Sequence, residues 1–410
     1  MDARVAPQVQ LQLTGGFPNV YFNSNAGTLS DVKHARFIPL PLLGDVSIPD
    51  RASYRYIRET DELWSTLHRG RLTSSRLAAA MGFYEPRAAK ILGLPRVYTS
   101  HSKMISVYHH LREKVSDAYD SNIQSSVAHD LNIHAHLVSY DKHMRDDARD
   151  DSLLESVKIR TSRYLHNQRD VQKVRMAWGS AQEAATISLL CQRLPGAPFF
   201  FMEVGLMSLD VASLCDTWGF RVDDLPPIGA TPDGLLVDTC TDAASAAHGF
   251  AQKHLDGARF KVVEVKNVCP FSSRRNGKKG FELRDRGPRN SLDPLYVPQL
   301  QFHMLCSGVD TALLASRSAT KGTNVFQMQR DDEYIRAMLE VIRCFYTTYV
   351  KKSKVPPQNA FSHMRLHSQL LLKTRELAYS CPLYCHIDQT HEQDIDMRTF
   401  LDSIHSTTNP

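Results

Sequence analysis

The chain of 410 residues is weakly basic, with 49 Lys and Arg side chains against 44 Asp and Glu. Its hydrophobic content of 42% is enough to bury the core of a folded enzyme, which excludes a fully disordered chain. We expect no membrane span and no secretory signal, and the eight cysteines, scattered singly, predict no disulfide framework. These features favour an intracellular, reducing compartment, either the nucleus or an organelle.

Residues 1–50 are predicted to form a partly ordered extension, because they lack periodicity and contain several glycines, asparagines and prolines. The next pattern is a helix that ends at Gly70 and is followed by Thr73-Ser74-Ser75 at the start of another helix. Hydroxyl groups and free backbone N–H groups would gather there beside Arg69 and Arg71. This combination predicts a binding site for a phosphate group.

Residues 100–172 have the composition of two or three helices rich in charge, Ser and His, and are interpreted as a helical insertion. A longer helix is predicted from Met176 to about Gln192. Glu183 lies in it among small and apolar neighbours, so its carboxylate is expected to face inward. The histidines between His129 and His143 are interpreted as part of a solvated helix or loop rather than a metal site.

Strands are predicted near residues 199–206, 234–238, 261–268 and 312–316, and a last helix near 332–351. The third strand carries Glu264 and Lys266, whose side chains share one face because strand residues alternate. Charges on an otherwise apolar strand are unfavourable unless they pair or bind a metal. Asp233, 31 residues earlier and beside a Pro and a Gly, can bring a third charge to this face. The alternative interpretation is a turn aspartate and a Glu-x-Lys pair, both exposed at a sheet edge.

Hydrolysis of a phosphodiester explains these residue types. Mg²⁺ and Mn²⁺ prefer carboxylate oxygens, and a bound cation clamps the phosphate and lowers the pKa of a water molecule. Asp233 and Glu264 are the candidate ligands, with the backbone carbonyl of Val265 completing the shell. Lys266 is the candidate group that orients the water or stabilises the developing charge.

A basic segment follows the candidate metal strand, and a Pro-initiated helix that carries Gln299 in its first turn begins soon after it. We expect residues 274–287 of this segment to form a loop that contacts DNA phosphates, through Arg274, Arg275, Lys278 and Lys279. The alternative is a solvated loop that only aids solubility. Residues 356–410 are interpreted as an accessory tail, and Cys381, Cys385 and His386 lack the second ligand pair of a zinc site.

Five motifs occur in a fixed order between about residues 60 and 350. They are Trp-x-x-x-x-Arg-x-Arg-x-Thr-Ser-Ser, Gly-x-x-x-Glu, Thr-Pro-Asp-Gly, Glu-x-Lys and Tyr-x-x-Gln-x-Gln. In this order they resemble the YqaJ-like viral recombinase nucleases typified by phage lambda exonuclease, within the PD-(D/E)xK superfamily. The resemblance implies an α/β fold over residues 51–355, with a restriction-endonuclease-like core whose central mixed sheet is flanked by helices.

The resemblance also implies roles for individual residues. Glu183, Asp233 and Glu264 match the family's ligands for two Mg²⁺ or Mn²⁺ ions, and Lys266 matches its catalytic lysine. Gln299, or the nearby Gln301, matches the family's substrate-positioning glutamine. Ser75 matches its phosphate-recognising serine, and Thr231 matches a small hydroxyl residue before Pro-Asp. His68 stands where the family usually has an arginine.

By the same resemblance the chain would be an exonuclease that degrades duplex DNA ends in the 5′→3′ direction, in recombination or repair. Its partners would be DNA and a single-strand annealing or recombination protein, without a membrane. The family forms trimers, but the oligomeric state stays open here. Two alternatives remain, a structure-selective endonuclease on the same fold and an inactive nucleic-acid-binding module.

Overall fold

A seven-stranded sheet forms the centre of the computed structural model, which describes residues 29, 32, 34, 36–40, 51–59, 61–113, 171–196, 198–238, 260–273, 281–283, 285–319 and 321–388. The strand order is β1-β3-β6-β7-β10-β11-β12. These strands are β1 (Phe37–Ile38), β3 (Phe199–Met202), β6 (Gly234–Asp238), β7 (Phe260–Asn267), β10 (Thr311–Arg317), β11 (Thr323–Gln329) and β12 (Leu383–Ile387).

The sheet is mixed. β7 pairs with β10 in parallel and with β6 in antiparallel orientation, and β1 is parallel to β3, while the other neighbours are antiparallel. β7 therefore lies in the middle of the sheet with hydrogen-bonded strands on both sides. The predicted α/β fold with a mixed sheet flanked by helices is confirmed.

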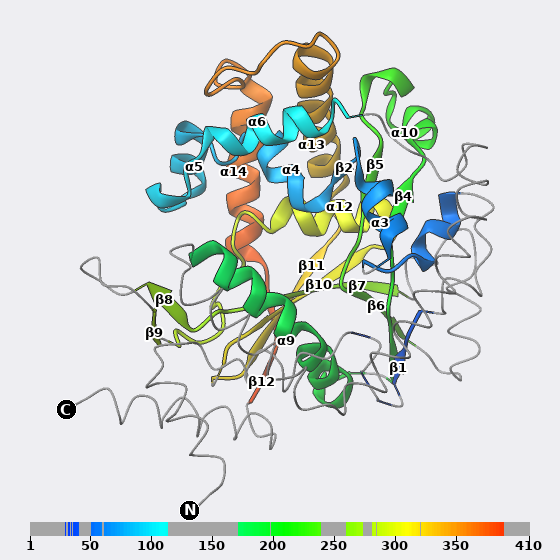
Figure 1. Ribbon diagram of the computed structural model, residues 1–410, viewed down its shortest axis with the longest axis vertical. Coiled ribbons are helices and arrows are strands. Elements are labelled where there is room, and N and C mark those ends of the chain that lie inside the picture. The colour runs from blue at the N-terminus through cyan, green and yellow to red at the C-terminus, as the bar shows by residue number, and fades with distance from the viewer. Residues whose placement is uncertain are drawn as a thin grey trace, which may run out of the picture.

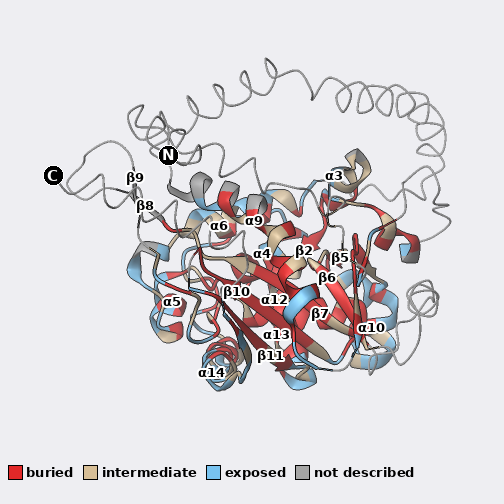
Figure 2. Cartoon of the chain, turned by 90° about the horizontal axis from the view of Figure 1, so that it is seen from below, coloured by how far each residue is buried: buried red, intermediate tan, exposed pale blue. Residues whose placement is uncertain are grey.

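Helices cover both faces of the sheet. Figure 1 shows α9 (Val171–Arg193) crossing one side, while α12 (Val297–Ser307) lies on the other side with a group of further helices. That group contains α4 (Ser74–Ala80), α5 (Pro86–Leu92), α6 (His101–His110), α13 (Asp332–Phe345) and α14 (Arg365–Ser380). Figure 2 shows burial concentrated along the central strands and α12, with exposed residues on α5 and α14.

Two apolar layers explain why β7 holds its place. Val263 and Val265 pack into a core with Ile187 and Leu190 of α9. Val262 belongs to the larger core on the α12 side of the sheet. Because side chains alternate along a strand, Glu264 and Lys266 share the face of Val262 and point toward α12.

Shorter elements complete the described part of the chain. The helices are α3 (Glu62–His68), α10 (Val211–Trp218) and the short helical turns η3 (Arg51–Tyr56), η4 (Arg96–Tyr98), η5 (Val222–Asp224) and η7 (Tyr346–Val350), the last a π-helix. A small sheet joins β2 (Leu72–Thr73), β5 (Ile228–Ala230) and β4 (Met207–Leu209), and a two-stranded ribbon joins β8 (Phe271–Ser273) and β9 (Phe281–Leu283). None of the helices in the described ranges is long and apolar enough to cross a bilayer.

The strand predicted over residues 199–206 ends earlier, at Met202. The next residue, Glu203, is buried and forms an ion pair with Arg58, with 3.0 Å between Oε1 and Nε. Gly205 then passes so close to the N-terminal segment that a Cβ atom there would lie 2.0 Å from the carbonyl oxygen of Ile57. The approach of residues 55–58 therefore interrupts the strand.

Two other segments also differ from the sequence-based expectation. β9 lies inside the stretch expected to be a loop. The stretch after residue 356, expected to be accessory, contributes α14 and the sheet strand β12. Most of the predicted extension (1–50) and of the predicted insertion (100–172) lies outside the described residues.

Candidate active site

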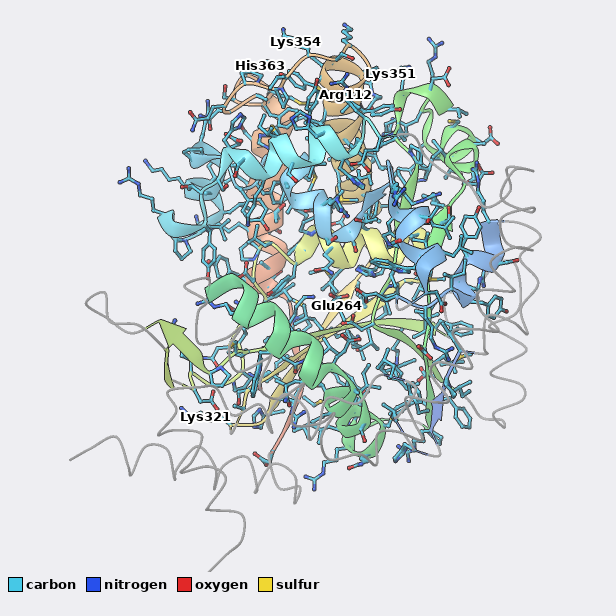
Figure 3. The ribbon with its side chains drawn as sticks, in the orientation of Figure 1. Arg112, Glu264, Lys321, Lys351, Lys354 and His363 are labelled. Carbon is cyan, nitrogen blue, oxygen red and sulfur yellow. The ribbon has the colours of Figure 1, made fainter. Side chains whose placement is uncertain are left out.

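Glu264 lies at the centre of the candidate site and is only 2% exposed. Its Oε1 atom accepts hydrogen bonds from the ammonium group of Lys266 and from Nε2 of Gln299, the latter at 2.6 Å. Gln299 is in the first turn of α12, which packs against β7. Figure 3 places Glu264 in the middle of the molecule, near α9 and α12. The structure thus brings together three predicted site residues.

The pairing of β6 with β7 places Asp233 close to Glu264. It directly precedes β6, whose Gly234 lies opposite Val263 of β7, and its Oδ2 accepts a hydrogen bond from the Val265 N–H at 2.6 Å. A Cβ atom on Gly234 would lie 2.2 Å from the ring of Phe201, so only glycine fits after the aspartate. The Pro-Asp-Gly sequence therefore brings the Asp233 carboxylate to β7.

Glu183 approaches from α9. The side chain of Asn267, at the end of β7, donates to the carbonyl oxygen of Gly179 at 3.1 Å and accepts from the hydroxyl of Thr186 at 2.7 Å. These two bonds fix the turn of α9 that carries Glu183. Burial, followed by the nearby carboxylates of Glu59 and Glu264, raises the pKa of Glu183 to about 7.

The pKa of Asp233 is also raised, by burial first and then by Glu264 and Glu183. Glu59 joins this cluster from the segment after η3, and burial together with the charge of Glu264 raises its pKa. Sequence reasoning missed Glu59, because it lies in a polar stretch with no periodicity that would distinguish it. Three carboxyl groups with raised pKa values, those of Glu59, Glu183 and Asp233, therefore surround Glu264 beside β7.

Lys266 remains a cation in this cluster. Burial alone would lower its pKa, but the carboxylates of Glu264 and Asp233 outweigh burial, so the net effect is a raised pKa. A lysine with a raised pKa stabilises negative charge and does not serve as a general base at neutral pH. This favours the second of the two roles predicted for Lys266, stabilisation of developing charge.

His303 is the second residue that sequence reasoning missed. It lies one helical turn after Gln299 on α12, is fully buried, and places Nε2 at 3.5 Å from Oε2 of Glu264. Within the described part of the chain, its two ring nitrogens and Glu264 Oε2 have no hydrogen-bond partner. Burial lowers the pKa of His303 to about 4, so the ring is neutral. The four-residue spacing from Gln299 was the available signal.

The residues fit a divalent cation in charge and in donor type. The raised pKa values of Glu183 and Asp233 reflect burial first and then repulsion between carboxylates, and a bound cation would offset both. Carboxylates are also the ligands that Mg²⁺ prefers. Val265, whose carbonyl is the predicted additional ligand, lies between Glu264 and Lys266 on β7. In the described ranges, however, no three His, Cys, Asp or Glu side chains converge closely enough to hold one ion. The structure brings the predicted ligands into one electrostatic cluster but not into a formed coordination shell.

The metal-free protein should lose stability as pH rises from about 5 to 8. Because the folded pKa of Glu183, about 7, exceeds its unfolded value near 4.5, the folded state binds more protons in this window. The loss should be about 2 kcal/mol after the shift is discounted for solvent screening. Thermal unfolding in EDTA at several pH values measures it. Glu183→Gln should flatten the profile, and an unchanged profile in this variant would contradict the assignment.

The predicted phosphate site is only partly as expected. Thr73 and Ser75 place their hydroxyl oxygens 3.3 Å apart, and Arg76 donates to the Thr73 hydroxyl at 3.2 Å. Ser74 is half-buried, and Arg69 and Ser75 are exposed. Arg76, which sequence reasoning did not single out, is thus the arginine beside the hydroxyl groups.

Arg71 has a different role from the one predicted. Arg71 is only 2% exposed, and its guanidinium donates to the Leu67 carbonyl at 2.9 Å, the Ser208 hydroxyl at 2.9 Å and the Ile228 carbonyl at 3.2 Å. It therefore ties α3 to the small sheet instead of facing a phosphate. His68 is likewise buried, with Nδ1 at 2.7 Å from the Trp64 carbonyl, and burial lowers its pKa to about 4.

Arg71→Ala should destabilise the fold by about 3 kcal/mol, because it leaves several buried acceptors without a donor. Arg69→Ala, on an exposed neighbour, is the matched control and should change stability by less than about 0.5 kcal/mol. Urea unfolding followed by circular dichroism measures both. Equal stability of the two variants would show that the Arg71 contacts contribute nothing.

The other predicted DNA contacts fall into three groups. Gln301 is fully buried and is used structurally, since Nε2 donates to the Gln329 carbonyl at 2.8 Å and Oε1 accepts from the Asp331 N–H at 2.9 Å. It therefore cannot substitute for Gln299. The Thr231 hydroxyl is buried without a hydrogen-bond partner among the described residues. Arg274, Arg275, Lys278 and Lys279 lie outside the described residues.

Comparisons with known proteins give a limited result. No protein-family model and no curated protein matches the chain. Among solved structures, the chain is similar to an alkaline exonuclease (LHK-Exo) from Laribacter hongkongensis, at 15% identity and a TM-score of 0.33, covering 72% of this chain and 97% of that one. LHK-Exo in complex with dAMP gives 14% identity, the same TM-score of 0.33, and coverage of 72% and 94%. A similarity at this level does not indicate a function, so the function has to be inferred from the residues of the site.

Proposed function

We propose that the chain is a divalent-metal-dependent DNA nuclease that hydrolyses phosphodiester bonds. The observation that carries this proposal is the buried Glu264 carboxylate, bound by Lys266 and Gln299 and coupled in charge to Asp233 and Glu183. A buried cluster in which acids outnumber cations is unfavourable by itself, which supports a cation as its natural occupant. The alternative of an exposed Glu-x-Lys pair at a sheet edge is wrong, since β7 is a central strand.

A Mg²⁺ or Mn²⁺ ion, or a pair of them, held by Glu183, Asp233, Glu264 and the Val265 carbonyl would polarise the phosphate and lower the pKa of a water molecule. The side chains around these ligands have separate tasks. Lys266 offers a fixed positive charge to the pentavalent phosphorus, while Gln299 holds the Glu264 carboxylate in one orientation. The water oxygen bonds to phosphorus as the bond to the leaving sugar oxygen breaks. The attacking water gives up a proton to solvent, and the leaving oxygen takes one from solvent.

We further propose an exonuclease that acts on duplex DNA ends in the 5′→3′ direction, in recombination or repair. This finer assignment is supported by the order of the five motifs along the chain. Ser75, Arg76 and the exposed Arg69 are the candidates for contact with a terminal phosphate, in place of Arg71. A single-strand annealing or recombination protein would be the matching partner.

Incubation with linear duplex DNA and with closed circular DNA, each in Mg²⁺ and in EDTA, tests the proposal. We expect Mg²⁺-dependent release of nucleotides from linear DNA only. The same assay compares wild type with variants in which an acid of the site becomes an amide, such as Glu264→Gln. Glu333→Gln, on the exposed start of α13, is the matched control for these variants and should behave as wild type. Equal cutting of circular DNA would make the protein an endonuclease. DNA binding without cleavage in any divalent metal would make it a binding module.

A further inference from the structure

His303 on α12 is a buried imidazole that lies beside the central carboxylate of the candidate site. Its side chain is 0% exposed, and its Nε2 atom is 3.5 Å from Oε2 of Glu264. Among the residues that the structure describes, neither ring nitrogen of His303 and not Oε2 of Glu264 has a hydrogen-bond partner. Two buried polar atoms that each lack a partner, Nε2 and Oε2, are therefore neighbours.

The other buried histidines in the described part of the chain differ from His303. Nδ1 of His68 lies 2.7 Å from the Trp64 carbonyl oxygen, and Nε2 of His367 lies 2.8 Å from the Met81 carbonyl oxygen. These two rings have the partner that a buried polar group normally has. An imidazole buried without a partner is unfavourable, so packing alone does not explain His303.

The hydrogen bonds of Glu264 explain why its Oε2 atom is available. Lys266 and Gln299 both donate to the other oxygen, Oε1. Gln299 precedes His303 by four residues on α12, so the two side chains project from the same face of the helix. One helix thus holds the first oxygen of the carboxylate and places an imidazole beside the second.

The separation of Nε2 and Oε2 is long for a hydrogen bond but suits two ligands of one cation. An N–H···O hydrogen bond usually spans about 2.7 to 3.2 Å. With metal–ligand bonds of about 2.1 Å, adjacent ligand atoms lie about 3.0 Å apart in an octahedral shell and about 3.4 Å apart in a tetrahedral one. The observed 3.5 Å is close to the second value, so only a small shift of either side chain is needed.

An imidazole ligand changes which cation a carboxylate site prefers. Mg²⁺ takes oxygen ligands, whereas first-row transition cations also take imidazole nitrogen. A nitrogen donor beside the carboxylates of Glu264, Asp233 and Glu183 therefore favours a transition cation.

We propose that Nε2 of His303 and Oε2 of Glu264 bind the same cation, and that His303 makes the site selective for a first-row transition cation such as Mn²⁺ over Mg²⁺. The proposal rests on the proposed nuclease function and adds a ligand and the class of cation. In the described ranges no third His, Cys, Asp or Glu side chain converges with this pair. The remaining positions therefore belong to water, to a DNA phosphate oxygen, or to Asp233 and Glu183 once the cation draws them in.

Pulsed EPR of substoichiometric Mn²⁺ bound to the full chain, without DNA, tests the ligand directly. We expect modulation from a directly bound ¹⁴N nucleus in wild type, and its replacement by the ¹⁵N pattern when the histidines carry ¹⁵N. His303→Gln should abolish the nitrogen signal. His363→Gln is the matched control and should keep it, because His363 is exposed and far from Glu264 in Figure 3. A wild-type spectrum without nitrogen coupling overturns the proposal, as does a coupling that survives in His303→Gln.

Calorimetric titration with Mn²⁺ and with Mg²⁺ tests the selectivity. The ratio of the two Kd values should shift toward Mg²⁺ at least about tenfold in His303→Gln, because the amide offers oxygen in place of nitrogen. His363→Gln should leave the ratio unchanged. A packing defect, or a hydrogen bond from His303 to Glu264, would affect both cations alike, so an unchanged ratio in His303→Gln contradicts the proposal. If this variant does not fold, the spectra of labelled and unlabelled wild type still decide whether a histidine nitrogen binds the cation.

The outcomes also separate this proposal from the nuclease proposal. If the nitrogen coupling and the change in selectivity are found but wild type cleaves no DNA in Mn²⁺ or Mg²⁺, His303 is a metal ligand and the nuclease function is wrong. If wild type cleaves linear DNA but bound Mn²⁺ shows no nitrogen coupling, the nuclease function holds and the role proposed for His303 is wrong.

Discussion

Glu264→Gln is expected to lower kcat by at least about a thousandfold without unfolding the protein, the size of effect seen when a metal-binding carboxylate is lost. The glutamine oxygen can still accept the hydrogen bonds from Lys266 and Gln299, so the local structure should be kept. What disappears is the negative charge that a cation needs. DNA binding should be unchanged or tighter, because one charge that repels phosphates has been removed.

Asp233→Asn should give the same loss for the same reason, and Asp238→Asn provides the control. Asp238 is the last residue of β6 in the same strand pair, but its carboxylate forms an ion pair with Lys261, with 3.0 Å between Oδ2 and Nζ. Single-turnover cleavage of linear DNA measures the rates, and anisotropy measures the binding. If Glu264→Gln retains more than a tenth of wild-type kcat, Glu264 is no metal ligand and the proposed function is wrong.

Lys266→Ala should lower kcat by roughly a hundredfold while metal affinity stays the same or rises. The ammonium group is held as a cation by Glu264 and Asp233, so its loss removes positive charge that only the transition state exploits fully. The same loss leaves Glu264 with one donor fewer on Oε1. We therefore also expect destabilisation of about 2 kcal/mol in the metal-free protein.

The comparison for Lys266→Ala is Lys261→Ala, a second lysine on β7 whose partner is the more exposed Asp238. It should leave kcat and Mn²⁺ binding unchanged. Calorimetric titration with Mn²⁺ separates the two effects predicted for Lys266. A variant that loses metal binding and rate together would show that Lys266 organises the carboxylates instead of acting on the phosphate.

Strong local patterns predicted the elements that carry the site. The apolar run around Glu264 predicted β7, and the long helical pattern around Glu183 predicted α9, each within a few residues of its observed limits. β11 and β12 were not predicted. β11 is buried on both faces over most of its length and so lacks alternation, while the first residues of β12 are exposed. Their positions in the sheet depend on contacts distant in sequence.

Which polar side chains would lie together was predictable where residue type and spacing express chemistry. Glu264, Lys266, Asp233 and Gln299 meet because β6, β7 and α12 bring them together. Arg71 and Gln301 were assigned wrongly, because buried arginine and glutamine side chains bind backbone carbonyls as readily as they bind phosphates. Sequence spacing does not show whether a polar group is buried.

The hydrogen bond from the Val265 N–H to Asp233 has a consequence for spectroscopy. This amide is held by a carboxylate oxygen at 2.6 Å, so its proton resonance should lie well downfield of its neighbours on β7. A cation that draws on the same carboxylate would weaken the bond and move the resonance upfield. One nitrogen-labelled valine signal could thus follow the occupancy of the site in solution, before any DNA is added.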